Sequence, residues 1–192
     1  MKRKVNLAIF VSGGGTNCEN IIRYFKGNEN VNIPVVVSSS AEAYALTRAE
    51  RLGVATEVIT RKELAEQPEK VLKAVEGCDY IILAGYLCKV PEYLIERFPK
   101  RIINIHPALL PRHGGKGMWG HHVHEAVKAA GDTESGITIH YVNAELDEGE
   151  HIAQFSTPLS PDDTPETIAE KVHVLEMEHF PQVIEQVILG EK

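Results

Sequence analysis

Short apolar runs alternate with amphipathic stretches through the first half of the chain. Continuous apolar runs of this length predict buried strands, and apolar residues at helical spacing predict helices packed against them. The predicted strands are residues 5–12, 31–37, 55–60, 79–84 and 101–106, and the predicted helices are residues 17–26, 41–52, 63–75 and 91–98. The alternation predicts an α/β fold, with a mostly parallel sheet and helices on both faces. Pro34 within the second strand indicates an edge position or a bulge.

The pattern changes in the second half of the chain. Residues 122–130 predict a helix, and residues 136–142 and 151–158 predict an antiparallel pair of strands. Residues 165–189 form one long amphipathic pattern, which Pro181 is expected to kink or divide. We find no repeat and no linker, so residues 1–192 are interpreted as a single domain.

Two polar residues end the fifth predicted strand. Pro107 offers no N–H, so the strand is expected to stop at His106. Side chains two apart share one face, which places Asn104 and His106 side by side at the carboxyl edge of the sheet, where ligands bind in α/β folds. An amide donor beside an imidazole can stabilise an oxyanion and move a proton. The alternative is that both residues only make hydrogen bonds in a loop.

A glycine-rich segment, Ser-Gly-Gly-Gly-Thr-Asn at residues 12–17, follows the first predicted strand. Glycines let backbone N–H groups approach an anion, and the start of a helix favours negative charge. The spacing matches neither the dinucleotide nor the triphosphate motif, so it favours a single phosphate group. A tight turn with Asn17 as an ordinary N-cap is the alternative.

A carboxylate is needed to orient a catalytic histidine and to stabilise its charged form. Asp147 is the candidate, and Glu145 and Glu148 are rivals that the sequence does not separate. The histidines near residue 121 have no carboxylate at a recognised metal spacing, so no metal is predicted.

The composition narrows the classes of partner. The net charge of −7 argues against a nucleic-acid surface. Three scattered cysteines indicate a reducing compartment. The sequence shows no secretion signal and no apolar run long enough to span a bilayer, so we expect a cytoplasmic protein that does not contact membranes.

The segment Asn-Ile-His-Pro-Ala-Leu-Leu-Pro (residues 104–111), together with residues 12–17 and Leu-Asp-Glu-Gly (146–149), resembles the folate-dependent formyltransferases. The resemblance covers nearly the whole chain and is nearest to the members that act on 5-phosphoribosylglycinamide in purine biosynthesis. It implies a Rossmann-like formyltransferase fold and transfer of a formyl group from 10-formyltetrahydrofolate to the substrate amine. It implies small-molecule partners, no metal, and a monomer or homodimer.

The resemblance also assigns roles to residues. It makes Asn104, His106 and Asp147 catalytic. The residues implied for the ribonucleotide are Gly14, Gly15, Thr16, Asn17, His173 and Glu176. The residues implied for the folate are Arg61, Leu87, Cys88, Lys89, Val90 and Asn104. The chain departs from the family in a glycine-rich insertion at residues 113–121. Its Lys116 and Trp119 are expected to cover a ligand or to pack at a subunit contact.

Other functions remain open at this point. A transferase acting on methionyl-tRNA or an amino sugar, and a formyltetrahydrofolate hydrolase, would share residues 104–111, but those proteins usually carry a further domain. A non-catalytic nucleotide-binding module is the alternative from another class.

Overall fold

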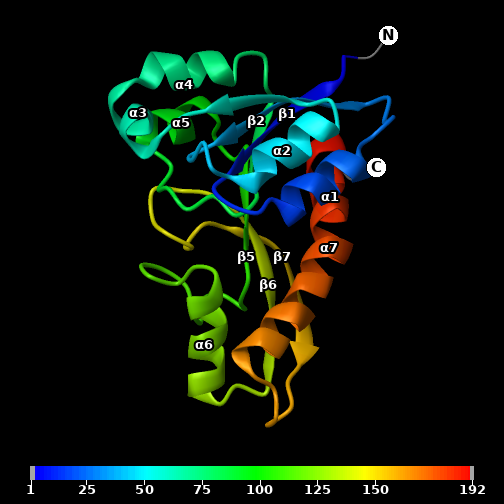
Figure 1. Ribbon diagram of the computed structural model, residues 1–192, viewed down its shortest axis with the longest axis vertical. Helices are drawn as coiled ribbons and strands as arrows, with labels where there is room; N and C mark the ends of the chain where they lie inside the picture. Colours follow the sequence, from blue (N-terminus) through cyan, green and yellow to red (C-terminus); the bar gives the residue numbers. More distant parts are fainter. Residues whose placement is uncertain (1–2, 191–192) are drawn as a thin grey trace.

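A single seven-stranded sheet with helices on both faces forms the protein, as the computed structural model of residues 3–190 shows (Figure 1). The strands are β1 (Val5–Val11), β2 (Val31–Ser38), β3 (Ala55–Val58), β4 (Tyr80–Leu83), β5 (Ile102–His106), β6 (Glu134–Tyr141) and β7 (His151–Pro158). The helices are α1 (Thr16–Tyr24), α2 (Tyr44–Arg51), α3 (Arg61–Glu66), α4 (Pro68–Ala74), α5 (Glu92–Arg97), α6 (His121–Ala130) and α7 (Pro165–Leu189). The strand order is β3-β2-β1-β4-β5-β6-β7.

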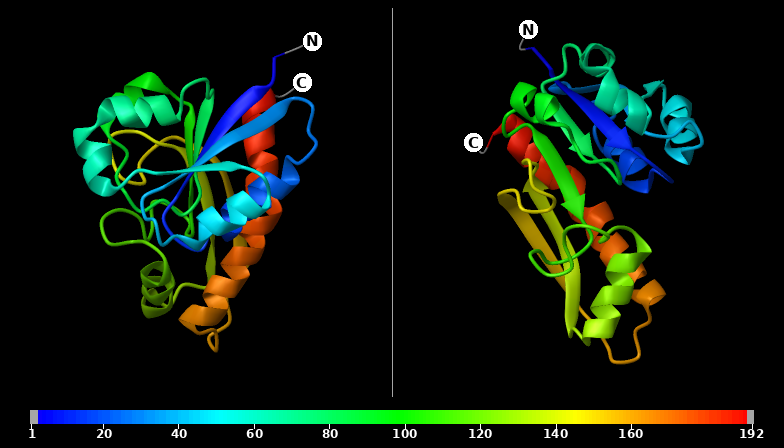
Figure 2. Two further views of the ribbon diagram at one scale, coloured as in Figure 1. Left: turned by 45° about the horizontal axis from the view of Figure 1, so that its top comes forward. Right: turned by 90° about the vertical axis from the view of Figure 1, so that its left-hand side faces the viewer.

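The first five strands pair in parallel, whereas β6 and β7 are antiparallel to their neighbours. Both features confirm the α/β fold expected from the sequence. The antiparallel strands extend away from the parallel part, beside α6 and the first half of α7 (Figures 1 and 2). In residues 3–190, no helix combines the length and the apolar character that crossing a membrane requires.

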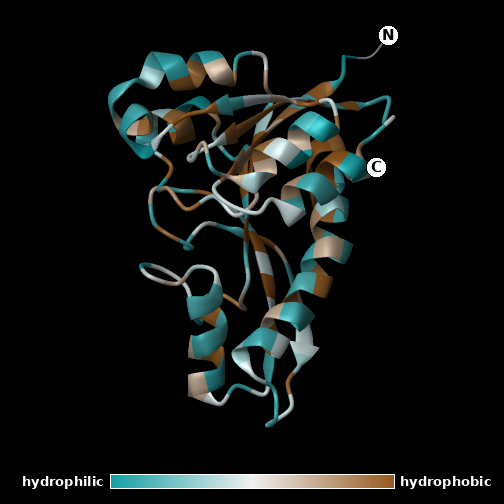
Figure 3. Ribbon diagram, viewed as in Figure 1, coloured by the Kyte–Doolittle hydropathy of each residue, from teal (hydrophilic) through white to brown (hydrophobic). Residues whose placement is uncertain are grey.

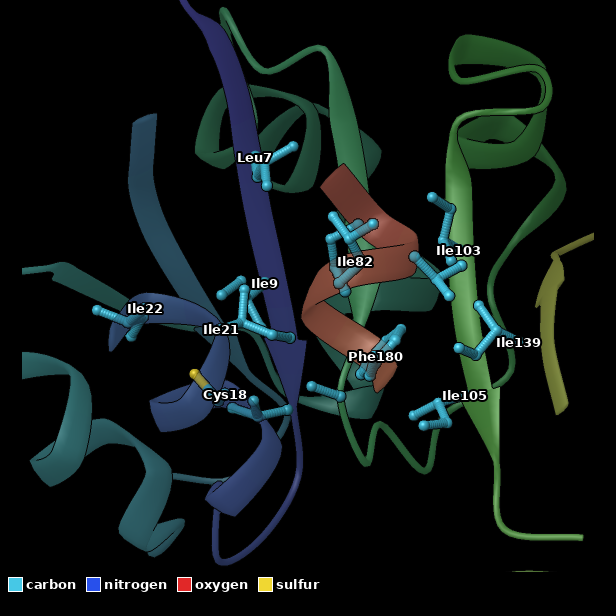
Figure 4. Close-up of a cluster of buried hydrophobic side chains, with 14 of the residues drawn as sticks. Leu7, Ile9, Cys18, Ile21, Ile22, Ile82, Ile103, Ile105, Ile139 and Phe180 are labelled. Atoms are coloured by element: carbon cyan, nitrogen blue, oxygen red, sulfur yellow. The ribbon is translucent and has the colours of Figure 1, made fainter. Parts of the chain in front are cut away.

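Alternate residues of the strands pack into two separate hydrophobic cores, one on each face of the sheet. Leu7 and Ile9 pack with side chains of α1 and α7, including Phe180 (Figure 4). Ala8 and Phe10 point to the opposite face, where α3, α4 and α5 cover the sheet. Hydrophobic residues concentrate on the strands and polar residues on the outer helices (Figure 3). The two-residue period of the strands therefore makes β1 buried on both sides.

The predicted helix at residues 63–75 is wrong, because two short helices occupy this region. Gln67 ends α3 and precedes α4 with a non-helical backbone (φ −129°, ψ 64°). Pro68 follows it, and the residue before a proline is pushed out of the helical region. Thr60 and Glu63 form a capping box that fixes the start of α3.

Pro181 was expected to kink or divide the last helix, and the division is wrong, because α7 runs unbroken through this residue. A proline inside a helix leaves the carbonyl four residues earlier without its usual donor. Here that carbonyl belongs to Met177, and Asn20 Nδ2 of α1 donates to it at 2.8 Å. A contact from another helix thus replaces the lost helical hydrogen bond.

Pro34 lies in an interior strand, so the edge alternative is wrong and the bulge is confirmed. The pairing of β1 with β2 steps from Asn6–Asn32 to Ala8–Val35, which leaves an extra residue in β2. The β3 strand pairs with β2 only from Val35 onward. Pro34 therefore lies outside that ladder, where its missing N–H costs no hydrogen bond.

The strand order indicates where a ligand is expected to bind. The chain leaves β1 toward β2 on one side and later returns to β4 on the other side. Ligands in open α/β sheets bind at this kind of reversal, outside the carboxyl ends of the strands. The segments after β1, β4 and β5 meet there.

Candidate active site

A cleft of about 1310 Å³ opens at the carboxyl ends of β1, β4 and β5. Most of the residues predicted for the site line it. These are Thr16, Asn17, Arg61, Leu87, Cys88, Lys89, Asn104, His106, Asp147, His173 and Glu176. Segments distant in the sequence therefore converge on one cavity. Gly14, Gly15 and Val90 do not line the cavity, and the Val90 side chain packs in the core beneath it.

The strand β5 presents Asn104 and His106 to the cleft, as its two-residue period predicts. His106 is only 4% exposed, and Asn104 is half-buried. Their ladder partners on β6 are His140 for Asn104 and Thr138 for His106. The sheet therefore fixes the backbone positions of both side chains.

The turn between β6 and β7 places Asp147 against His106. Asp147 Oδ2 lies 3.6 Å from His106 Nδ1. Asp147 has a positive φ of 58°, and Gly149 passes so close to the Tyr141 carbonyl that no side chain would fit there. Glu145 and Glu148 are exposed. Of the three candidate carboxylates, only Asp147 faces the histidine.

The glycine-rich insertion lies over this pair. The carbonyl of His113 accepts a hydrogen bond from His106 Nε2 at 2.7 Å. The N–H of Gly115 donates to Asp147 Oδ2 at 2.9 Å. Lys116 and Trp119 of the same segment line the cleft.

His140 is a further residue at this site that the sequence analysis missed. Its Nε2 lies 3.1 Å from Asn104 Nδ2, and its Nδ1 lies 3.0 Å from the carbonyl of Tyr141. A carbonyl can only accept, so Nδ1 carries the proton and Nε2 accepts from the amide. Burial lowers the pKa of His140, which keeps it neutral. The hydrogen bond to His140 therefore fixes the orientation of the Asn104 side-chain amide.

The glycine segment forms the turn into α1. Gly15 is the N-cap in a left-handed conformation (φ 77°), so the alternative in which Asn17 caps the helix is wrong. Ser12 ties this turn to the next loop, because the N–H of Leu87 donates to Ser12 Oγ at 2.9 Å. The loops after β1 and β4 are thereby locked together at the rim of the cleft.

A polar cluster from α1, α6 and α7 forms one wall of the cleft. Glu176 Oε2 accepts from Asn17 Nδ2 at 3.1 Å and contacts His173 Nδ1 at 3.3 Å. The hydrogen bond to Glu176 raises the pKa of His173. Two buried atoms in this wall, Asn17 Oδ1 and His124 Nδ1, have no hydrogen-bond partner among residues 3–190. These two atoms can therefore form hydrogen bonds with a polar group of a ligand.

The opposite part of the cleft is more apolar. Leu87 is half exposed at its entrance, and Cys88 is nearly buried below it. Tyr86, which the sequence analysis did not single out, packs edge-on against Phe10. Its buried hydroxyl has no hydrogen-bond partner in the part of the chain that the structure describes. Arg61 begins α3 at the far end. This part of the lining therefore combines apolar surface with a basic side chain.

No three histidine, cysteine or acidic side chains in residues 3–190 form a group that could hold a metal ion.

Comparison with known proteins places the chain in a family. Residues 5–184 match the Formyl transferase family. The chain is 39% identical to a chloroplastic phosphoribosylglycinamide formyltransferase of Arabidopsis thaliana, over 95% of this chain and 65% of the plant protein. It is 33% identical to the phosphoribosylglycinamide formyltransferase of Haemophilus influenzae, over 93% of this chain and 84% of that protein. It thus spans less than two thirds of the plant relative but most of the bacterial one.

The fold agrees with solved structures of the same group. The crystal structure of a phosphoribosylglycinamide formyltransferase from Brucella melitensis superimposes with a TM-score of 0.87 at 35% identity, over 99% of this chain and 98% of that one. The match spans the parallel strands, the antiparallel pair and the segments that form the cleft. By sequence and by fold, the chain belongs to the formyl transferase family.

Proposed function

We propose that this chain transfers the formyl group of 10-formyltetrahydrofolate to the amino group of 5-phosphoribosylglycinamide. The observation that carries the proposal is the convergence of Asn104, His106 and Asp147 in one cleft, between a polar wall and an apolar one. Relatives named for this reaction match nearly the whole chain. The cleft also exceeds the volume that one drug-sized ligand needs, as a reaction between two substrates requires.

The ribonucleotide is assigned to the polar wall. Its phosphate is bound by N–H groups of the turn at Gly14, Gly15 and Thr16, where the start of α1 favours negative charge. Asn17 and the Glu176–His173 pair lie next along the wall and bind the sugar and glycinamide parts. The buried Asn17 Oδ1, which has no partner, is available to a substrate donor.

The folate is assigned to the apolar side. The pterin contacts residues 87–89 mainly through their backbone, and the acidic tail extends toward Arg61 and Lys89. Asn104 lies between the two substrates, at the end of β5. This arrangement brings the formyl group of one ligand to the amine of the other.

The chemistry follows from these positions. The neutral amine attacks the formyl carbon, and the carbonyl electron pair moves to the oxygen. Asn104 Nδ2 and His106 Nε2 donate hydrogen bonds to this oxyanion. The electron pair on the oxygen then re-forms the carbonyl, and the bond from the formyl carbon to N10 of the folate breaks. His106 Nε2 gives its proton to N10 and takes up the proton of the amine, so the imidazole ends as it began. Asp147, which faces Nδ1, orients the imidazole.

An absorbance assay with 10-formyltetrahydrofolate, run with and without 5-phosphoribosylglycinamide, tests the proposal. We expect deformylation only with the ribonucleotide, and one formylated product for each folate released. Deformylation that does not depend on the ribonucleotide would contradict the proposal and indicate a hydrolase. Absence of turnover with both substrates present would also contradict it.

A further inference from the structure

The helix α2 does not line the cleft, but it contacts the glycine turn directly. Figures 1 and 2 show α2 beside α1, next to the end of β1. The N–H of Ala45 donates to the carbonyl of Gly13 at 3.0 Å. Arg48 Nε donates to the carbonyl of Gly14 at 2.9 Å. These contacts come from outside the set of residues predicted for the site.

Three successive carbonyls of the turn, those of residues 13–15, accept hydrogen bonds from the protein. The third belongs to Gly15, which accepts from the N–H of Glu19 at 2.9 Å. In a planar trans peptide the C=O and the following N–H point in opposite directions. The N–H groups of Gly14, Gly15 and Thr16 therefore point away from these donors. Within residues 3–190 no protein acceptor pairs with these three N–H groups.

Arg48 is itself held in place. Its guanidinium pairs with Glu19 of α1, which also accepts from Arg23. The Arg48 group lies over the Tyr44 ring, 5.0 Å from the centroid. Hydrogen bonds from the two arginines lower the pKa of Glu19 and keep it ionised. The arginine fork is thus fixed between a carboxylate and a backbone carbonyl.

The position of Gly15 shows how closely α2 approaches. A side chain on Gly15 would overlap Ala45 Cβ, and φ is 77°. The turn therefore has a single arrangement against α2, and Arg48 is the only side chain of α2 that reaches a carbonyl of the turn among the residues described.

We infer that Arg48 is a positioning residue for phosphate binding. It fixes the Gly14–Gly15 peptide so that its N–H is directed at the substrate phosphate, without touching the substrate itself. This inference rests on the proposed function, because it assigns the phosphate of 5-phosphoribosylglycinamide to the glycine turn. Arg48 thereby favours phosphorylated substrates over their phosphate-free forms.

The test compares Arg48→Met with Arg51→Met. Arg51 lies on the same helix and also over the Tyr44 ring, 6.0 Å from its centroid, but does not contact the turn. For Arg48→Met we expect KM for 5-phosphoribosylglycinamide to rise about tenfold, because the variant loses one hydrogen bond from a charged group. We expect kcat within about twofold of wild type, since the reacting groups are untouched. The KM for glycinamide riboside, which lacks the phosphate, should not change, and Arg51→Met should match wild type.

Two further measurements extend the test. One asks whether Arg48 acts through the geometry of its guanidinium or only through its charge, and the other does not depend on the proposed formyl transfer. Arg48→Lys keeps the charge without the fork, and we expect it to recover only part of the loss. Binding of ribose 5-phosphate, measured by calorimetry, should weaken about tenfold in Arg48→Met whether or not the chain transfers a formyl group. Equal effects on the phosphorylated and phosphate-free substrates, unchanged ribose 5-phosphate binding, or full recovery in Arg48→Lys would each overturn the inference.

Discussion

His106 Nε2 donates a hydrogen bond to the backbone carbonyl of His113, 2.7 Å away. This is the same N–H that the proposed mechanism directs at the oxyanion. The carbonyl of His113 therefore occupies the position that the proposed mechanism gives to the formyl oxygen. Substrate binding must exchange the carbonyl of His113 for the formyl oxygen.

Asp132 anchors the insertion in the position where it contacts His106. It accepts from the His113 ring at 2.7 Å and from Arg112 at 3.2 Å. We predict that Asp132→Asn loosens the segment and speeds hydrogen exchange of the Gly115 amide, which donates to Asp147. Asp162→Asn, at an exposed position, is the control. An unchanged exchange rate at Gly115 would show that Asp132 does not hold the segment.

His140 is predicted to support catalysis through Asn104. Removing its ring in His140→Ala leaves Asn104 Nδ2 without its acceptor, so the amide loses its fixed direction. We expect kcat to fall about tenfold to hundredfold, because misplacement of a catalytic group has effects of this size. His140→Gln offers a new acceptor and should recover part of the rate. Steady-state kinetics that give a kcat within twofold of wild type for His140→Ala would refute the assignment.

His140 also predicts a pH dependence of stability. Burial lowers its pKa in the folded protein, so the unfolded chain binds a proton that the folded protein does not. Stability should therefore fall as the pH decreases through about 6.5, the pKa of an unperturbed histidine. Urea unfolding between pH 8 and pH 5 should show a shallower loss for His140→Gln. His122→Gln, at an exposed position on α6, should keep the wild-type slope, and identical slopes for all three proteins would contradict this explanation.

Asn20 is predicted to stabilise α7 only because of Pro181. Asn20→Ala leaves the Met177 carbonyl unpaired and should cost about 1–3 kcal/mol of unfolding free energy. In a Pro181→Ala background, the new N–H can donate to Met177, so the same change should cost clearly less. Denaturant unfolding of the four proteins gives this coupling. Strictly additive effects would mean that Asn20 acts in another way.

Gly149 is predicted to be required for the turn that holds Asp147. A Cβ at this position would overlap the Tyr141 carbonyl oxygen, which is backbone and cannot move away freely. Gly149→Ala should therefore destabilise the protein by about 1–3 kcal/mol. Gly13→Ala is the control for thermal unfolding, because an added Cβ there meets nothing within 4 Å. Equal melting temperatures for the two variants would contradict the prediction.

The sequence predicted those features that depend on local periodicity. Asn104 and His106 share a face because they are two residues apart in a strand, and this spacing is visible without any partner strand. His140 was missed because its position opposite Asn104 depends on the register of β5 and β6, which spacing within one strand does not reveal. Asp147 could not be separated from Glu145 and Glu148 for a similar reason, since the direction of a turn side chain depends on the positive φ of Asp147.

The two internal prolines show the same limit. Pro68 separates two helices, whereas Pro181 lies inside one helix without dividing it. The difference comes from Asn20, which reaches across from α1 to satisfy the Met177 carbonyl. A tertiary contact of this kind overrides the local preference of proline, and the sequence around Pro181 does not reveal it.

The rate of ribonucleotide-dependent deformylation by His106→Ala tests the central claim most directly. His106 lies within reach of both Asn104 and Asp147, and the proposed mechanism uses it for the oxyanion and for the proton. With folding verified by circular dichroism, we predict a loss in kcat of at least about hundredfold relative to wild type. Turnover within about threefold of wild type would contradict the account and move the chemistry to other residues of the cleft.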